Sequence, residues 1–80
     1  MIAMECDNPN WAPLEAVGGP QMCSEFMWMG RQSGIEFFKH IRTRRYLLLD
    51  SEGRCYRRTT IGFEAADLET ELRCARGGRR

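Results

Sequence analysis

The sequence has little of what enzymes and metal centres need. His40 is the single histidine among 80 residues, and the four cysteines stand 17, 32 and 19 residues apart, so no C-x-x-C pair exists. Structural zinc sites use closely spaced pairs of Cys and His ligands. The spacing therefore predicts no metal site, and no Gly-rich phosphate loop or other motif points to a cofactor.

Two weaker chemical patterns are present, and each has a simpler interpretation. Cys55 and His40 could form a nucleophile and base pair on neighbouring strands, because a nearby imidazolium activates a thiolate. A single cysteine on a strand is more often a small buried hydrophobe. Gly18-Gly19-Pro20 could suggest an anion site before a helix, but no strand precedes it and no Lys-Ser or Lys-Thr follows it, so a linker is the simpler interpretation. We expect a protein that is not an enzyme.

Long hydrophobic runs are also missing. The longest uncharged apolar run, residues 26–29, is far too short to cross a bilayer. Near the start, Met1 to Met4 are followed at once by Glu5 and Asp7, a pattern that does not fit a secretory signal. We therefore expect a cytoplasmic protein with no membrane partner, whose cysteines are free thiols.

Net charge is nearly absent, but the charges are unevenly distributed. The formal charge of +1 divides into −4 for residues 1–38, +5 for residues 39–58 and zero for residues 59–80. The arginines of the basic stretch, interleaved with Tyr46 and Tyr56, are Arg42, Arg44, Arg45, Arg54, Arg57 and Arg58. This stretch can match an acidic surface or an anionic partner.

The length predicts one small domain with a thin core. We expect residues 1–80 to fold as one unit, with loose tails at 1–8 and 77–80. Five Met, four Phe and two Trp are more apolar bulk than a monomeric core of this size easily hides. The composition therefore predicts a homodimer, or another partner that covers the surplus.

The N-terminal third predicts two short helices. Asn10 can cap a helix over residues 11–17, and Gly18-Gly19 ends it. A proline suits the first turn of a second helix over residues 20–29, which stops at a glycine. This second helix would be apolar nearly all round, which is typical of a helix buried on more than one side.

The segment 35–41 fits two structures. Ser33 and Glu36 have the spacing of a capping box, and Ile35 and Phe38 fall at a helical interval. Two adjacent phenylalanines and two isoleucines instead favour a strand, which would join the next apolar run through a turn-length link. We choose the strand.

The basic stretch predicts a hairpin. Residues 46–49 and 55–58 flank Asp50-Ser51-Glu52-Gly53, which has the residues of a type I turn with a G1 bulge. The predicted register pairs Leu49 with Cys55, Leu48 with Tyr56, Leu47 with Arg57 and Tyr46 with Arg58.

A last helix follows the hairpin. Ala65, Leu68, Leu72 and Ala75 share one helical face, acidic residues come early and basic ones late, and Gly77 stops the helix. The predicted fold is α+β, with two short N-terminal helices, a three-stranded antiparallel meander and a C-terminal helix packed on the sheet.

We expect a small non-enzymatic protein-interaction or self-associating module. Large aromatic side chains dominate interface energetics, and arginines orient an acidic partner. The predicted contact residues are Trp28, Met27, Tyr46 and Tyr56, and the predicted anion-binding residues are Arg44, Arg45, Arg57 and Arg58. Trp28 would be the anchor, unless it is simply the second side of a buried helix.

The alternative is nucleic-acid or other anionic-ligand binding through the arginine cluster of residues 39–58. Guanidinium groups form hydrogen bonds with phosphate oxygens, and nucleic-acid bases stack on aromatic rings. Against it, the isoelectric point near 7.7 lies below the roughly 9 expected of a nucleic-acid-binding domain. No known nucleic-acid-binding signature is present either, so a protein partner is the first expectation.

Overall fold

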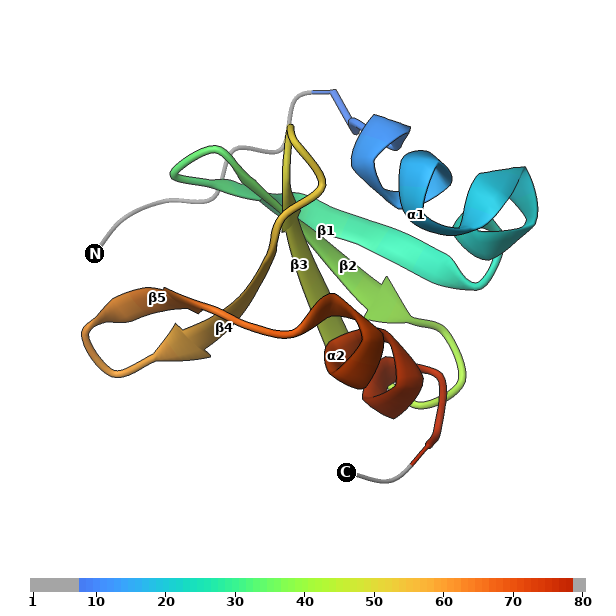
Figure 1. Cartoon of the computed structure of the whole chain (residues 1–80). Coiled ribbons are helices and arrows are strands. Elements are labelled where there is room, and N and C mark those ends of the chain that lie inside the picture. Colours follow the sequence, from blue (N-terminus) through green and yellow to red (C-terminus); the bar gives the residue numbers. More distant parts are fainter. Residues whose placement is uncertain (1–7, 79–80) are drawn as a thin grey trace.

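The computed structural model of the chain describes residues 8–78, which form an α+β fold (Figure 1). A helix precedes a five-stranded antiparallel sheet, and a second helix follows it. The strands lie in the sheet in their chain order, so each pairs with its sequence neighbour. The elements are α1 (Ala12–Cys23), β1 (Phe26–Gln32), β2 (Ile35–His40), β3 (Tyr46–Asp50), β4 (Cys55–Thr59), β5 (Gly62–Ala65) and α2 (Leu68–Ala75).

The prediction of two N-terminal helices and three strands is wrong. Helix α1 continues through a kink at Gly19, where φ is +80°, and takes the first part of the expected second helix. The rest of that segment is β1, because pairing with β2 places Trp28 opposite Phe38 and Met27 opposite Lys39. Aromatic side chains that alternate between two faces suit a strand, and this tertiary pairing overrides the local helical signals.

A tight turn that the sequence interpretation missed creates the β1–β2 hairpin. Gln32 pairs with Ile35, which leaves Ser33 and Gly34 as a two-residue loop. Their φ angles of +56° and +77° are those that a type I′ turn requires at both positions. The register also shifts between Trp28 and Gly30, so a bulge bends β1.

The strand chosen for residues 35–41 and the hairpin after it are confirmed, with one difference in register. The Asp50 carboxylate accepts hydrogen bonds from the backbone N–H groups of Glu52 and Arg54, both at 2.9 Å, and Gly53 has the expected positive φ. Leu49 pairs with Cys55 and Leu48 with Tyr56 as predicted.

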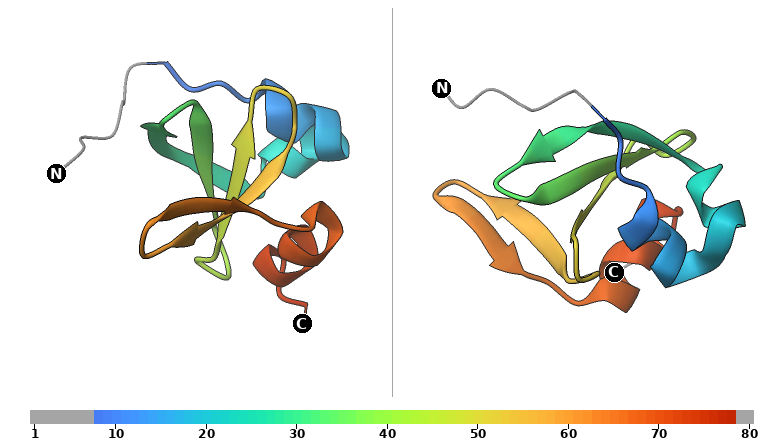
Figure 2. Two further views of the ribbon diagram at one scale, coloured as in Figure 1. Left: turned by 60° about the vertical axis from the view of Figure 1, so that its left-hand side comes forward. Right: turned by 90° about the horizontal axis from the view of Figure 1, so that it is seen from above.

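The other two predicted pairs, Leu47 with Arg57 and Tyr46 with Arg58, do not form in the register of β3 and β4. Strands β3 and β4 therefore part after two pairs. At its other edge β4 pairs with β5, which was not predicted, through Arg57 opposite Glu64 and Arg58 opposite Phe63. In Figure 2 the β1–β2 and β4–β5 hairpins lie as two leaves that meet along β3.

Strand β3 is buried on both faces and divides the apolar side chains into two clusters. Its side towards the helices carries Leu47 and Leu49, which belong to the larger cluster. The other members of that cluster are Leu14, Met22, Phe26, Phe38, Cys55 and Ala75. Its other side carries Leu48, which packs with Ile35, Phe37, Tyr56 and Phe63. We call this second side the open face.

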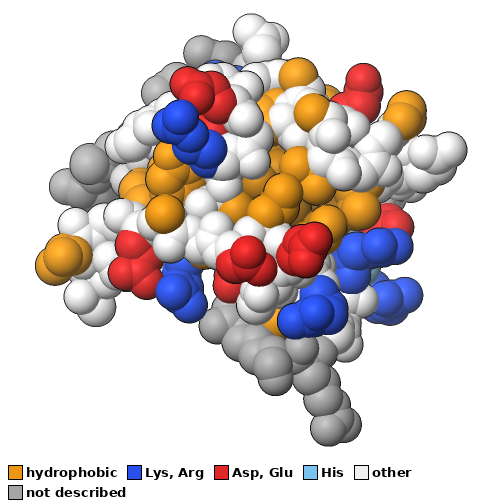
Figure 3. Space-filling view, viewed as in Figure 1, with side chains coloured by type: hydrophobic (Ala, Val, Ile, Leu, Met, Phe, Trp, Pro, Cys, Tyr) orange, Lys and Arg blue, Asp and Glu red, His pale blue; other side chains and the backbone are white. Residues whose placement is uncertain are grey.

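The helices cover the larger cluster incompletely. Trp11, Val17, Leu68 and Leu72 pack against it and stay partly exposed. Figure 3 shows hydrophobic side chains at the surface between α1 and α2.

The C-terminal helix was predicted, but the placement of Ala65 on it is wrong, because Ala65 ends β5 and the helix begins at Leu68. The helix is capped at both ends. The Asp67 carboxylate accepts from the backbone N–H of Thr70 at 2.9 Å, which is a side-chain N-cap. At the other end the N–H of Gly77 bonds the Cys74 carbonyl and the N–H of Gly78 bonds the Arg73 carbonyl, the two bonds of a Schellman motif. Residues 1–7 and 79–80 of the expected loose tails lie outside the described residues.

The link between β2 and β3 holds the end of α2. The Thr43 hydroxyl donates to the Ala75 carbonyl at 2.5 Å, the Arg45 guanidinium to the Cys74 carbonyl at 3.1 Å, and Arg42 to the Arg76 carbonyl at 3.1 Å. Cations that bond the last carbonyls of a helix also complement its dipole. We call residues 42–45 the capping loop.

Leu49→Ala tests how far the fold depends on β3, because Leu49 is fully buried in the larger cluster on the helix side of the sheet. Removing a buried leucine loses its transfer free energy and leaves a cavity, so unfolding free energy should fall by about 2–5 kcal/mol. Ile61→Ala is the matched control, since Ile61 is 98% exposed and should change stability by no more than about 0.5 kcal/mol. Urea unfolding of both variants measures the difference, and equal losses would contradict the assignment of the core.

Candidate binding groove

A groove opens on the open face where β3 and β4 part. It has a volume of about 470 Å³ and receives side chains from β1, β2, β3, β4 and α2. The residues that line it are Met29, Phe37, Tyr46, Leu48, Tyr56, Arg57, Arg58 and Glu71. The separation of the two strands after Leu48 and Tyr56 makes this space, because a paired strand would have closed it.

Aromatic rings form much of the groove wall. Phe37 is buried, and its ring meets those of Tyr46 and Phe63 edge to face, with centroids 6.2 and 5.9 Å apart. Tyr46 is 44% exposed. Edge-to-face packing fixes the orientation of these rings, so the wall is formed before any ligand arrives.

Tyr56 is fixed by a hydrogen bond at its polar end. Its hydroxyl donates to the Asp50 carboxylate at 2.8 Å, and that carboxylate also receives the two turn N–H groups. The hydrogen bond to Asp50, and then burial, raise the pKa of the Tyr56 hydroxyl. The hydroxyl therefore stays protonated and keeps the ring against the groove.

Two cations of the open face lie over aromatic rings. The Arg58 guanidinium is 5.9 Å from the centroid of Phe37, and the Lys39 ammonium is 5.6 Å from that of Tyr46. Among residues 8–78, neither forms an ion pair with a carboxylate. Arg57 differs, because it pairs with Glu64 at 3.0 Å. Arg58 and Lys39 are therefore the cations that a ligand can engage.

Four of the eight predicted site residues meet at the groove, namely Tyr46, Tyr56, Arg57 and Arg58. Met27 lies on β1 opposite Lys39. The sequence interpretation missed the contributions of Phe37, Leu48, Met29 and Glu71. The signal for Phe37 and Leu48 was available, because consecutive apolar residues in a strand predict burial on both faces.

Trp28 lies on the helix side of the sheet, opposite Phe38 and away from the groove. Its indole N–H donates to the Glu36 carboxylate at 2.7 Å, and Arg31 binds the same carboxylate at 2.5 Å. The Arg31 guanidinium also lies 5.8 Å from the Trp28 ring centroid. These contacts give Trp28 an internal role, and they satisfy the carboxylate of Glu36, which is only 3% exposed.

The other two predicted arginines belong to the capping loop. Arg45 bonds a carbonyl of α2, as described above. Arg44 is exposed and has a φ of +66°, in the left-handed region that non-glycine residues rarely adopt. Neither lines the groove.

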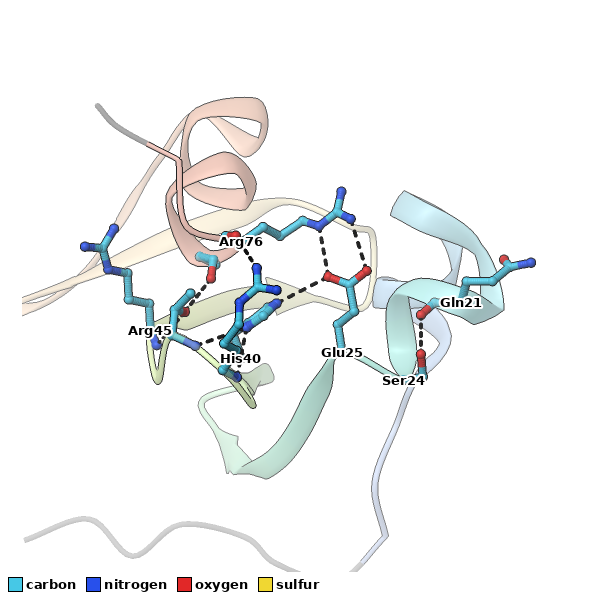
Figure 4. Close-up of polar contacts among 9 residues, drawn as sticks. Gln21, Ser24, Glu25, His40, Arg45 and Arg76 are labelled. Carbon is cyan, nitrogen blue, oxygen red and sulfur yellow. Dashed lines mark hydrogen bonds and ion pairs between the residues drawn. The ribbon is translucent and has the colours of Figure 1, made fainter.

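A second polar cluster joins three distant parts of the chain (Figure 4). The Arg76 guanidinium binds the Glu25 carboxylate through two hydrogen bonds of 2.9 and 3.0 Å. Nε2 of His40 lies 3.2 Å from the same carboxylate, and its Nδ1 accepts from the N–H groups of Arg42 and Thr43. Because Nδ1 accepts, the proton of the neutral ring is on Nε2, which donates to Glu25. The cluster is fully bonded and holds the ends of α1, β2 and α2 together.

Cys55, the cysteine considered above as a nucleophile, is buried and not activated. Burial raises the pKa of the Cys55 thiol to about 11, and Cys55 and Cys74 are 4% and 5% exposed. No group of three His, Cys, Asp or Glu residues within 8–78 could hold a metal ion.

Compared with protein-family models, with curated protein sequences and with solved structures, the chain has no significant match. Neither helix within residues 8–78 is long and apolar enough to span a membrane.

Thiol reactivity tests whether Cys55 is inert. A shift of the pKa from 9.0 to about 11 lowers the thiolate fraction at neutral pH about 100-fold, and burial blocks access as well. Alkylation of the native protein, mapped by peptide mass spectrometry, should label Cys55 at least about 100-fold more slowly than after unfolding in guanidinium chloride. Preferential labelling of native Cys55 would contradict its structural role and revive an enzymatic interpretation.

Acid titration tests the Glu25 cluster. The hydrogen bonds of Arg76 hold the pKa of Glu25 below its usual range. A carboxyl with a lowered folded-state pKa stabilises the fold above its unfolded pKa of about 4.3 and loses this contribution as pH falls through the folded pKa. Glu25→Gln should therefore lower unfolding free energy at pH 7, and its difference from the unmodified protein should shrink below about pH 4. A difference that is independent of pH would show that the charge of Glu25 is unimportant.

Proposed function

We propose that this chain is a non-enzymatic protein-binding module that contacts its partner through the groove. The observation that carries the proposal is the combination of preformed aromatic walls with two cations that have no carboxylate partner among the described residues. Protein interfaces are enriched in Tyr, Phe, Met and Arg, and their strongest contacts are aromatic or arginine anchors in desolvated pockets.

Charge favours a different protein over a second copy of this chain. In a two-fold symmetric dimer through the open face, the same patch lies on both sides of the interface. Lys39 and Arg58 of both copies would then gather in one interface, and like charges there reduce affinity. The same two cations would instead increase the affinity for an acidic partner. Self-association, expected from the apolar content, is therefore the weaker form of this proposal.

Nucleic-acid binding is the second candidate function. The exposed ring of Tyr46 favours it, because an aromatic face beside a cation can stack a base and bind its phosphate. The isoelectric point near 7.7 opposes it, since nucleic-acid-binding domains have values above about 9.

We also propose a cytoplasmic, reducing location. Three cysteines of the described residues, Cys23, Cys55 and Cys74, are free thiols. Disulfide bonds form and persist in oxidising compartments, so free thiols are what a reducing compartment maintains.

Site-specific photo-crosslinking in cells tests the proposed function. Replacing Tyr46 by the photo-crosslinking residue benzoylphenylalanine should give a discrete protein adduct, because this position lies at the groove rim. The same replacement at the exposed Glu69 of α2 is the matched control and should give no such adduct. Adding Arg58→Gln should reduce the yield at position 46 severalfold.

Three results would contradict the proposal. Equal adducts at both positions, or none at position 46, would exclude the groove as a protein contact. An adduct that nuclease removes would support nucleic-acid binding instead. Light scattering of the purified protein at low and high salt, after removal of nucleic acid, reports self-association separately.

A further inference from the structure

We propose that the groove recognises an acidic-aromatic peptide segment, in which an aromatic side chain enters between β3 and β4 and a neighbouring carboxylate binds Arg58. This inference rests on the proposed function and specifies the chemistry of the partner.

The size and lining of the groove suit one large apolar side chain. Its volume of about 470 Å³ falls in the range of roughly 300–1,000 Å³ that is typical of ligand pockets. The deep side is apolar, since Phe37 and Leu48 are 4% and 5% exposed. Tyr46 and Tyr56 stand on the two strands that part, so they flank an inserted group.

Aromatic rings fit these walls better than aliphatic chains do. The ring of Phe37 in the groove already packs edge to face against those of Tyr46 and Phe63. A further ring can extend this arrangement, and aromatic pairs gain about 0.5–1.5 kcal/mol beyond the apolar area that they bury.

The carboxylate requirement follows from the position of Arg58. Its guanidinium lies over the Phe37 ring while Arg58 itself is exposed, so this cation stands at the rim of the apolar space, where a ligand can reach it. Hydrogen bonds between a guanidinium and a carboxylate are short and can be bidentate, which suits an acidic residue next to the inserted ring. Lys39, over Tyr46, adds a second positive charge on the same face. A basic peptide would be repelled by both cations.

The lining of the groove argues for a peptide rather than a polyanion. Most of its lining residues are apolar or aromatic, namely Met29, Phe37, Tyr46, Leu48 and Tyr56. A peptide can place an uncharged side chain there and one carboxylate at Arg58. A nucleic-acid strand carries a phosphate at every nucleotide and cannot avoid the apolar part as easily.

Selection from phage-displayed random heptapeptides tests this inference on the full chain. The unmodified protein should enrich peptides in which Trp, Tyr or Phe is followed within two positions by Asp or Glu. For a selected peptide, Arg58→Gln should weaken binding about tenfold, a loss equal to that of one charge-assisted contact of about 1.4 kcal/mol. Replacing the acidic residue of the peptide by its amide should weaken binding by the same factor. When this replacement is combined with Arg58→Gln, the total loss of affinity should still be about tenfold, because both changes remove the same contact.

Arg54→Gln is the matched control. Arg54 lies in the same basic stretch, but it is exposed at the β3–β4 turn and pairs with Glu52 at 3.0 Å. Its replacement should change affinity less than twofold. Chemical-shift mapping should place the peptide against Tyr46 and Tyr56, and the circular dichroism spectra of both variants should show that they fold.

The other outcomes separate this inference from the proposed function. Selected peptides that bind the groove equally well with amides in place of acids would overturn the acidic-aromatic requirement and leave a protein-binding groove. Selection that yields no groove binder would overturn the inference, while the cross-linking experiment decides the function independently. Groove binding of a labelled dodecathymidylate more tightly than of any selected peptide would overturn both in favour of nucleic acid.

Discussion

Burial of β3 on both faces is the constraint on which the rest of the structure depends. Leu47 and Leu49 point to the helix side, and Leu48 points to the open face. In 80 residues this arrangement leaves few apolar side chains for each face, so neither cluster is completely covered. The helices cover most of one side, and the folded-over leaves of the sheet cover part of the other (Figure 2). The groove is what remains open.

The site therefore arises from a defect in sheet pairing. Had β3 and β4 continued in register, Arg58 would have faced Tyr46 as a cross-strand neighbour and the space between them would have been filled. Instead β3 and β4 part, while β5 pairs with the other edge of β4. Phe63 of β5 packs against Phe37, and Arg58 lies above the same ring. Interruptions of a ladder often re-aim side chains in this way. Arg58 and these rings therefore lie together at the place where the pairing of β3 with β4 stops.

Sequence reasoning found the parts of the fold whose signals are local. The Asp50–Gly53 turn, the C-terminal helix and its glycine stop carry their own hydrogen bonds, so residues close in sequence were sufficient. It failed where a distant pairing decides the structure. The apolar residues 26–29 fit a buried helix as well as a strand, and only their pairing with β2 makes them a strand. The four groove residues that were predicted followed from charge and aromatic content, whereas Glu71 comes from α2 and has no sequence signal that links it to β4. Ser33-Gly34 did carry a usable signal, since a polar residue before glycine is a common hairpin turn.

The capping loop has a consequence for the dynamics of the chain. Helix α2 has only eight residues, and a helix of that length is marginal in water by itself. Three of its last carbonyls are held by Arg42, Thr43 and Arg45, some 30 residues earlier in the chain. If this loop opens, the helix loses its C-terminal anchor, so the two segments form one cooperative unit. Hydrogen exchange of the amides of α2 and of residues 42–45 should then report one common free energy of opening, although the two segments are far apart in sequence.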